Sequence, residues 1–252
     1  MKQSAVAAKQ FGETAAAYLS SAVHAQGADL QAAREIVAGV KNAAVLDLGC
    51  GGGHVSFAAA PAASSVIACD LSAQMLEVVA NAAKERGLGN IATQQAQAEA
   101  LPFDDGVFDI VITRFSAHHW GDVPAGLREA HRVLRAQGKL VVIDIAAPET
   151  PLHDTTLQAV ELLRDGSHVR DYRASEWTAM LRSAGFAIEA SRTWKLKMVF
   201  DDWIARMRTP PERVTAIRSL LDLAPEETRE YFAVEADHSF TIDAALFQAE
   251  RR

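Results

Sequence analysis

The stretch AAVLDLGCGGGHVS, residues 43–56, constrains the fold of this chain more than any other segment. An apolar run leads through Asp47 into four glycines within five positions, a pattern that predicts a buried strand ending in a tight turn. Alternate glycines, here Gly49, Gly51 and Gly53, let the chain turn into a helix and let a ligand approach the backbone. One glycine normally suffices for a turn, so we interpret this stretch as a ligand-binding turn.

This stretch begins a regular alternation of strands and helices that runs to about residue 146. Further apolar runs in SSVIACD, NIATQQAQAE, VFDIVITRF and KLVVIDIA predict four more strands. Amphipathic helices lie between them, one capped by Ser72 and ended by Gly87, and another over residues 122–134. The alternation predicts an α/β protein with a doubly wound parallel sheet, whose ligands bind at the carboxyl ends of the strands.

Composition narrows the classes of partner. The 252 residues carry a formal net charge of -7, so the chain has no electrostatic reason to follow a phosphate backbone, and we predict no nucleic-acid partner. No apolar run is long enough to span a membrane, and the N-terminus shows no signal-peptide pattern. The two cysteines, Cys50 and Cys69, are expected to be free thiols in a reducing compartment. We therefore expect a cytoplasmic monomer or homodimer.

Asp70 ends the second predicted strand, 21 residues after Gly49. A carboxylate at that position can accept two hydrogen bonds from a ribose diol. The alternative is that Asp70 competes with Ser72 to cap the next helix. The glycine turn and Asp70 together are compatible with a dinucleotide and with a nucleoside.

Two features separate those ligands. The dinucleotide pattern G-x-G-x-x-G requires Gly or Ala at position 54 or 56, where this chain has His54 and Ser56. In addition, the carboxylate of Asp47 would repel a pyrophosphate but could orient an ammonium group, directly or through water. These features favour S-adenosylmethionine (SAM), which carries a ribose, an ammonium and a carboxylate. An NAD-type oxidoreductase remains the alternative.

The motifs resemble those of class I SAM-dependent methyltransferases. VLDLGCGGGHVS resembles their first motif and VIACDLSAQML their acidic second motif. QAQAEALPFDDGVFDIVITRFSAHHW and EAHRVLRAQGKLVVIDIAAP resemble later motifs of the subgroup similar to ubiquinone/menaquinone methyltransferases, also described as methyltransferase type 11-like. The resemblance covers about residues 43–148, and extends more weakly to FGETAAAYLSSAVHAQG and SHVRDYRASEW. It implies a Rossmann-like fold with a mostly parallel seven-stranded sheet, an antiparallel terminal strand, and methyl transfer from SAM, with S-adenosylhomocysteine (SAH) as product.

The same resemblance implies a role for each matching residue. The methionine part of SAM would lie beside the backbone of Gly49, Cys50 and Gly51; Asp47 would help hold its amino group, and Arg114 would offer its backbone near its carboxylate. Asp70 would bind the ribose hydroxyls. The adenine would pack on Leu71 and Met75, and its edge would meet Gln97 and Ala98. Position 97 is usually aspartate in this subgroup, and the carbonyl of Gln97 can also accept a hydrogen bond. The turn AQG replaces the usual Pro-Gly-Gly before the fifth strand.

Methyl transfer from SAM is an in-line displacement, for which the protein supplies positioning, desolvation and, where the acceptor must lose a proton, a base. His118 and His119 follow the fourth predicted strand, and one of them is the candidate base for a small organic acceptor. The alternative is that they cap the next helix or pack against Trp120. We predict no metal site, because adjacent histidines rarely share an ion and no third ligand has suitable spacing. Tyr18 is either a cation–π partner of the sulfonium or a helix anchor.

We predict a single domain with a late helical insertion that acts as a lid. The domain begins with an N-terminal helical cap at 1–40, which has two short helices within 11–40, and continues with a cofactor-binding core at 41–147. Acceptor-side segments follow at 148–252 and include the helical insertion at 200–236 and a last strand. His168, Arg170 and Tyr172 either line the acceptor pocket or form a solvated loop, and Trp194, Phe200 and Trp203 favour core positions. A protein that binds the cofactor without catalysis is a further alternative.

Overall fold

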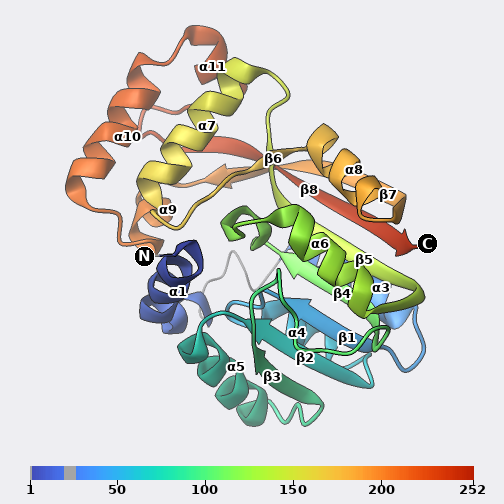
Figure 1. Cartoon of the computed structure of the whole chain (residues 1–252). Coiled ribbons are helices and arrows are strands. Elements are labelled where there is room, and N and C mark those ends of the chain that lie inside the picture. The colour runs from blue at the N-terminus through green and yellow to red at the C-terminus, as the bar shows by residue number, and fades with distance from the viewer. Residues whose placement is uncertain (1, 20–26) are drawn as a thin grey trace.

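The apolar runs predicted as strands form one mixed sheet in the computed structural model, which describes residues 2–19 and 27–252, with residues 13–19 described by backbone only (Figure 1). The strand order is β3-β2-β1-β4-β5-β8-β7, and β6 pairs with β5 beside this path. The strands are β1 Ala44–Leu48, β2 Ser65–Asp70, β3 Ile91–Gln95, β4 Phe108–Arg114, β5 Leu134–Ala147, β6 Tyr172–Arg173, β7 Phe186–Met198 and β8 Phe240–Arg251.

The direction of the strands confirms the predicted doubly wound sheet with an antiparallel terminal strand. Strands β1 to β5 pair in parallel, and β8 runs antiparallel to both β5 and β7. The order reverses between β1 and β4, which is where ligands of such sheets bind. The short β6 adds a strand to the seven that were expected, because two residues of the predicted polar stretch pair with Ala146 and Ala147.

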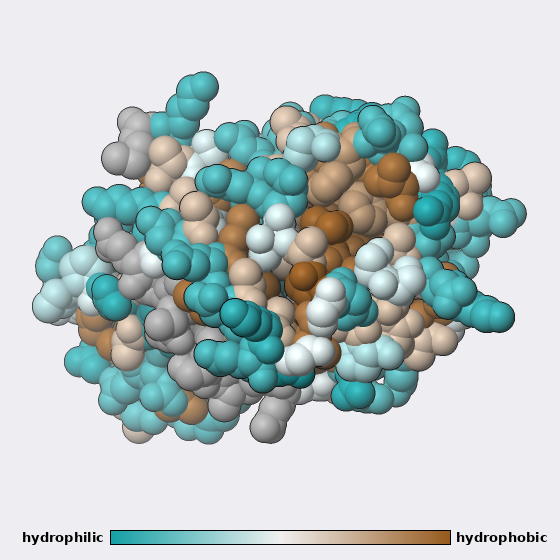
Figure 2. Space-filling model, turned by 90° about the horizontal axis from the view of Figure 1, so that it is seen from below, coloured by the Kyte–Doolittle hydropathy of each residue, from teal (hydrophilic) through white to brown (hydrophobic). Residues whose placement is uncertain are grey.

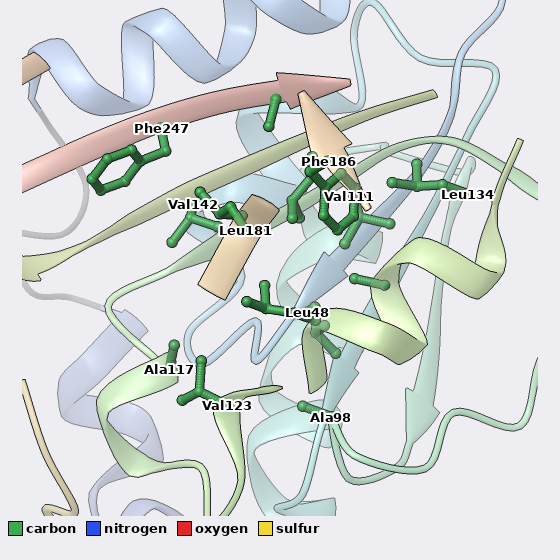
Figure 3. Packing of buried hydrophobic residues seen from close by; sticks show 14 of the residues in the cluster. Leu48, Ala98, Val111, Ala117, Val123, Leu134, Val142, Leu181, Phe186 and Phe247 are labelled. Carbon is green, nitrogen blue, oxygen red and sulfur yellow. The ribbon is translucent and has the colours of Figure 1, made fainter. Parts of the chain in front are cut away.

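Helices cover both faces of the sheet because neighbouring residues of the central strands point to opposite sides. Val45 packs in the cluster under the helices of one face, and Leu46 packs in the cluster under the other. Figure 3 shows the second cluster, in which Val111 and Val142 of the sheet lie near Leu181. The helices are α1 Gln3–Leu19, α3 Ala28–Ala38, α4 His54–Ala59, α5 Ala73–Glu85, α6 Val123–Val133, α7 Pro151–Arg164, α8 Ala174–Ser183, α9 Phe200–Arg206, α10 Pro211–Leu223 and α11 Glu226–Tyr231, with a 3-10 turn, η1, at Ala117–His119.

The N-terminal caps of α5 and α6, the helices that follow β2 and η1, are the residues that the sequence places there. The Ser72 hydroxyl accepts a hydrogen bond from the Met75 amide at 3.2 Å, which confirms the predicted cap of α5. Asp122 caps α6 in the same way, through the Ala125 amide at 2.9 Å. The chain then leaves α5 through Gly87, whose φ of +70° is in the left-handed region.

The structure corrects two details of the sequence prediction. The first helix begins at Gln3, well before residue 11. The AQG segment is a bulge within β5, since Phe108 pairs with Leu134 and Ile110 already pairs with Lys139. A Cβ at Gly138 would lie 2.8 Å from a backbone carbonyl oxygen, so the bulge needs glycine at this position.

The C-terminal third adds a helical layer beyond the carboxyl ends of the parallel strands. Helices α7, α9, α10 and α11 bury a cluster that includes Trp203, Ile217 and Phe240. Figure 1 shows α1 beside α9, and the Gln10 amide donates to the Met207 carbonyl at 3.1 Å. On the lower face of the molecule, hydrophobic residues gather in a central hollow ringed by hydrophilic ones (Figure 2). No helix in the described ranges is long and apolar enough to cross a membrane.

Trp177 on α8 gives a test of the packing between helix and sheet. Its side chain is 1% exposed, and its ring lies 6.3 Å from that of Phe247 on β8. We expect Trp177→Ala to lower the free energy of unfolding by about 3–5 kcal/mol, because the cavity cannot close fully. Urea denaturation measures this loss. Leu223→Ala, at a side chain that is 82% exposed, is the control and should change little; equal effects of the two substitutions would contradict the packing described.

Candidate active site

A cavity of about 230 Å³ lies at the carboxyl ends of the parallel strands, where the strand order reverses. It collects residues from the β1 turn, the end of β2, the segment after β3, η1 and α1. The predicted site residues among its lining are Gly49, Gly51, Asp70, Leu71, Gln97, Ala98 and His119. The fold therefore brings more than half of the predicted site residues to one cavity.

The three glycines of the β1 turn differ in what they allow. All have positive φ, of +73° at Gly49, +47° at Gly51 and +79° at Gly53. A Cβ at Gly51 would meet nothing within 4 Å, so this backbone faces open space. A Cβ at Gly49 would lie 1.9 Å from the Ser116 hydroxyl oxygen, so the absence of a side chain there admits Ser116. Gly53 instead allows close packing, since its Cβ would lie about 3 Å from Val79 of α5.

Asp70 connects the β1 turn to the start of α5. Its Oδ2 accepts from the Gly51 amide at 2.9 Å, and its Oδ1 accepts from the Ser72 amide at 2.9 Å. The Ser72 hydroxyl is the actual helix cap, so the two residues share the helix terminus. Burial raises the pKa of Asp70, although these backbone hydrogen bonds oppose the rise. A carboxylate has about four acceptor positions, so Asp70 retains capacity toward a ligand in the cavity.

Asp47 is not among the described residues that line this cavity. It lies two residues after Val45 on β1 and therefore points to the same face of the sheet, where α4 covers it. Its Oδ2 accepts from the Ser56 amide at 2.9 Å and from the Ser56 hydroxyl at 2.6 Å. Burial raises the pKa of Asp47 to about 7, against the effect of these bonds.

The remaining predicted residues have other surroundings. Cys50 and Met75 are buried, and Arg114 pairs through its Nε with Asp29 at 2.5 Å. These three residues are likewise absent from the described lining of the cavity. The side chain of Tyr18 lies outside the described residues. The cofactor roles of all four remain predictions.

Sequence reasoning predicted an N-terminal helical cap with Tyr18 near the cofactor, but it missed Ser116 and the α1 residues that line the cavity. Ser116 lines the cavity, and its hydroxyl accepts from Trp120 Nε1 at 3.1 Å. The preceding residue, Phe115, has a φ of +51°, which is unusual for a bulky side chain. Helix α1 covers the cavity with Gln3, Ser4, Ala7, Ala8 and Phe11. The segment FSAHHW draws attention to its histidines, and no local pattern indicates which residues of α1 face the cavity.

A second cavity, of about 80 Å³, adjoins the first and shares Phe115 and His119 with it. Its other lining residues come mainly from the C-terminal third: His118, Ile145, Glu161, Arg164, Asp165, Asp171, Leu196, Met198, Trp203, Arg206 and Ile242. Trp203, expected in the core, is 1% exposed and also lines this cavity. His119 is thus the ionisable side chain that both cavities have in common.

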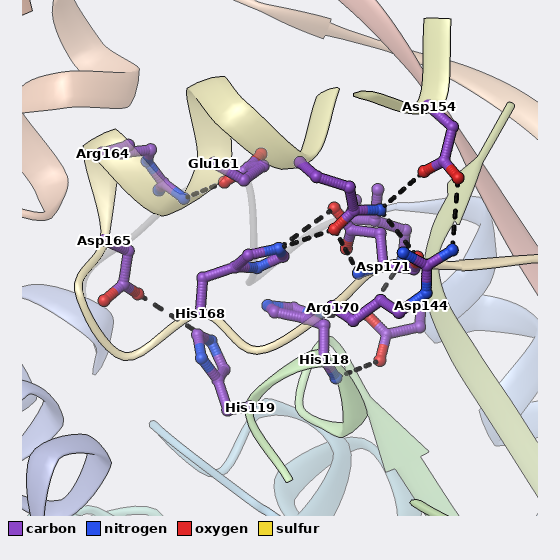
Figure 4. Close-up of polar contacts among 12 residues, drawn as sticks. His118, His119, Asp144, Asp154, Glu161, Arg164, Asp165, His168, Arg170 and Asp171 are labelled. Atoms are coloured by element: carbon purple, nitrogen blue, oxygen red, sulfur yellow. Dashed lines mark hydrogen bonds and ion pairs between the residues drawn. The ribbon is translucent and has the colours of Figure 1, made fainter. Parts of the chain in front are cut away.

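His118 forms a buried ion pair. Its Nδ1 lies 2.5 Å from Asp144 Oδ1 on β5 (Figure 4). Burial alone would lower the pKa of His118, but the charge and hydrogen bond of Asp144 outweigh it and raise the pKa to about 9. At neutral pH His118 is therefore protonated and is not available as a base.

His119 has the opposite protonation state. Its Nδ1 lies 3.1 Å from the Ser167 carbonyl oxygen, which can only accept, so Nδ1 carries the proton and Nε2 keeps its lone pair. Burial and the positive charge of His118 lower the pKa of His119 to about 3. Asp165 Oδ2 lies 4.0 Å from Nε2 and would stabilise a proton taken up there. His119 is consequently a neutral acceptor between the two cavities.

The polar segment SHVRDY joins this cluster. Figure 4 shows His168 close to His118 and His119, and the rings of His118 and His168 are 5.9 Å apart. Burial lowers the pKa of His168 to about 2, so this ring is neutral. Arg170 pairs with Asp154 at 3.2 Å, and Tyr172 lies in β6, so neither is a solvated loop residue. Of this segment, the described lining of the second cavity includes Asp171 but not His168, Arg170 or Tyr172, so the prediction that these three line a pocket stays a prediction.

Comparisons with known proteins support one family. Residues 46–142 match a methyltransferase domain family. The chain is 49% identical over 199 residues to the uncharacterized protein YafE of Escherichia coli K12, a match that covers 79% of this chain and 96% of that one. It is 36% identical over 247 residues to the uncharacterized methyltransferase YcgJ of Bacillus subtilis, covering 96% and 98%. The crystal structure of the Bacillus YcgJ protein superposes with a TM-score of 0.85 over 89% of this chain and 98% of that one.

A more distant similarity is to the ubiquinone/menaquinone biosynthesis C-methyltransferase UbiE of Citrifermentans bemidjiense. It amounts to 37% identity over 112 residues, which is 43% of this chain and 48% of the relative. This match therefore spans about half of that protein.

The opposite charge states of the adjacent histidines can be measured directly. We expect ring-nitrogen NMR to show His118 protonated at neutral pH and titrating near pH 9, with His119 still neutral at about pH 5. Since the folded-state pKa of His118 exceeds the ordinary value of 6.5, its stabilising contribution is complete below that pH and is lost as pH rises through about 9. His238, whose ring is hydrogen-bonded to Asp222 away from this cluster, provides a histidine signal from outside the site for comparison in the same spectra. A neutral His118 at pH 7 would refute the ion pair.

Proposed function

Because this chain belongs to the class I SAM-dependent methyltransferases, in the subgroup similar to the ubiquinone/menaquinone methyltransferases, we propose that it methylates a small organic acceptor held in the second cavity. The observation that carries the proposal is the pair of adjoining cavities that share His119. The first is lined by part of the set predicted for the cofactor, and the second offers a separate space beside it. Such an arrangement suits transfer between two bound molecules.

The lining of the first cavity fits SAM. The Asp70 carboxylate can accept from ribose hydroxyls, and Leu71 and Ala98 give apolar walls beside the amide of Gln97. The open backbone at Gly51 leaves room for the amino-acid part. Asp47 would reach the ammonium through water, since the Ser56 amide and hydroxyl both bind its Oδ2. When bound, SAM supplies an activated methyl group, and its sulfur departs as the thioether of SAH.

In this proposal His119 is the general base. The acceptor atom forms its bond to the methyl carbon as the carbon–sulfur bond breaks, and the acceptor proton moves to Nε2 of His119. An atom that has just gained a methyl group without losing its proton is strongly acidic, so a weak base suffices. Asp165, 4.0 Å from Nε2, stabilises the resulting imidazolium.

His118 has a positioning role here. Its ion pair with Asp144 fixes η1 to β5, and its carbonyl oxygen accepts from the amides of Val169 and Arg170. These bonds hold the loop that carries Ser167 against His119. The pair of predicted catalytic histidines is therefore divided into one base and one charged anchor.

The parts of the chain follow the same division. The first cavity is built mostly from the core at 41–147 under α1, and most of the second comes from segments beyond residue 148. This supports the proposal of an N-terminal cap, a cofactor-binding core and acceptor-side segments with a helical lid.

The two alternatives lack this support. An NAD-type oxidoreductase would use a third glycine for close packing of the first helix at position 54, where His54 instead begins α4. A protein that binds the cofactor without catalysis would not need a neutral histidine between two cavities. Family membership likewise favours the methyltransferase.

Cofactor choice and the role of Asp70 are tested together by calorimetric titration with SAM and with NAD. We expect SAM alone to bind, and Asp70→Ala to weaken binding by about 1.5–3 kcal/mol, roughly 10- to 100-fold, through the loss of charged hydrogen bonds. Asp222→Ala, at a side chain that is 65% exposed, is the matched control. Binding of NAD without SAM would overturn the proposed function, and unchanged SAM affinity in Asp70→Ala would remove the ribose assignment.

Catalysis is tested by SAH release from SAM in the presence of phenols, carboxylates, amines and activated carbon acids. With an acceptor that gives turnover, we expect His119→Ala to lower kcat by about 10²–10⁴-fold with little change in SAM affinity. His118→Ala should instead lower thermal stability along with activity, because it leaves Asp144 buried without its partner. Full activity of both variants would refute a base in this pair, and no turnover with any class would favour the non-catalytic alternative.

A further inference from the structure

Asp171 presents a buried carboxyl group to the second cavity. The residue is 1% exposed and lines that cavity, and its Oδ2 has no hydrogen-bond partner in the part of the chain that the structure describes. His168 Nε2 lies 3.9 Å from Oδ2, which is beyond hydrogen-bond distance. An unsatisfied buried polar group is costly, so its presence at a cavity wall calls for a partner.

The backbone holds this carboxyl group in place. The Asp171 amide donates to Gln158 Oε1 at 3.1 Å, and its carbonyl oxygen accepts from Gln158 Nε2 at 2.8 Å. Gln158 on α7 also bonds His168 at 3.1 Å. Since its main chain is fixed on both sides, Asp171 cannot easily turn its side chain toward solvent.

Other acidic groups of the same region differ from Asp171 because each has a partner. These pairs are Asp144 with His118 at 2.5 Å, Glu161 with Arg164 at 3.2 Å, and Asp165 with the Ser167 amide and hydroxyl at 2.7 Å each. Among these acidic groups, Asp171 is the one with a buried carboxyl oxygen for which the described residues offer no hydrogen-bond partner.

Charge indicates what that molecule is. Burial raises the pKa of Asp171 well above its usual value, although the positive charges of His118 and Arg164 oppose the rise. A protonated carboxyl donates a hydrogen bond through its O–H. A protonated Asp171 carries no negative charge to attract an ammonium group, and the neighbouring carboxylates of Asp144 and Glu161 are already paired with His118 and Arg164. Apolar walls formed by Leu196, Met198 and Ile242 complete the cavity.

The geometry points to Asp171 as the residue that recognises the acceptor, by donating a hydrogen bond from its buried carboxyl to a hydroxyl or carbonyl oxygen of a neutral molecule. The apolar part of that molecule packs on the side chains of β7 and β8. This inference rests on the proposed function, since it places the acceptor in the second cavity beside His119. It names neutral oxygen-bearing acceptors as the substrate class and disfavours amines.

Phenol and benzylamine are suitable probes, because both carry an apolar ring, while phenol presents a neutral hydroxyl and benzylamine presents an ammonium on an additional methylene. Binding is measured by NMR titration of the SAH-loaded protein and, separately, of the protein alone. We expect phenol to bind and benzylamine to bind at least about tenfold more weakly. Benzylamine binding as tightly as phenol, or no phenol binding at millimolar concentration, would overturn the inference.

Three variants separate hydrogen bonding from charge. Asp171→Asn keeps a donor without an ionisable group and should retain phenol binding within about threefold, whereas Asp171→Ala should lose about tenfold or more. Asp201→Asn, at a side chain that is 85% exposed on α9, is the matched surface control. Equal phenol affinity in all variants, or a loss in Asp171→Asn as large as in Asp171→Ala, would contradict a donor role.

Infrared spectroscopy keeps the inference testable if Asp171→Ala fails to fold. We expect a protonated-carboxyl C=O band in the wild-type protein that is absent from Asp171→Asn and shifts when phenol binds. A missing band, or one that phenol leaves unchanged, refutes the donor role. The proposed function can fail independently of this inference. If SAM does not bind but phenol binds the protein and its variants as expected, the methyltransferase activity is rejected and the role of Asp171 is retained.

Discussion

The buried ion pair between His118 and Asp144 is the contact on which the arrangement of the site depends. It joins the segment after β4 to β5, and the carbonyl oxygen of His118 then receives the amides of the loop between α7 and β6. Its charge also explains the state of the neighbouring ring, because a second imidazolium 4.1 Å away would be repelled. This contact therefore helps to fix where His119 lies and, together with burial, keeps that ring neutral. Two adjacent, chemically identical side chains acquire different properties from their partners alone.

Much of the lining of the first cavity could be predicted from sequence because its determinants are local. The glycine turn, Asp70 and the Ser72 cap each follow directly from a strand or begin a helix, and parallel strands bring their carboxyl ends to one edge. Asp47 shows the limit of this reasoning. It lies beside the turn, but the pleat of β1 directs its side chain to α4, where its Oδ2 binds Ser56, so its contact with an ammonium through water remains a proposal. Proximity along the chain does not specify the face of a strand.

The acceptor side could not be predicted in this detail because its contacts are distant in sequence. Asp171 matters through a missing partner, which no pattern records, and β6 exists only because two residues pair with the end of β5. The insertion was expected as a lid, yet the contribution of Trp203 to a cavity wall depends on how α9 packs on α7. Asp171, from a predicted polar stretch, and Trp203, expected in the core, thus both line the second cavity.

Gly49 and Ser116 make up one structural unit although 67 positions separate them. The space that glycine leaves is filled by the serine hydroxyl, which lies where a Cβ would be. A side chain at position 49 could be tolerated only if the residue at 116 were smaller, and the hydrogen bond from Trp120 would then be lost as well. Substitutions at the two positions should therefore be coupled, so that homologous chains that differ at one are expected to differ at the other. An apparently generic turn glycine thereby restricts the identity of a residue beyond the next three strands.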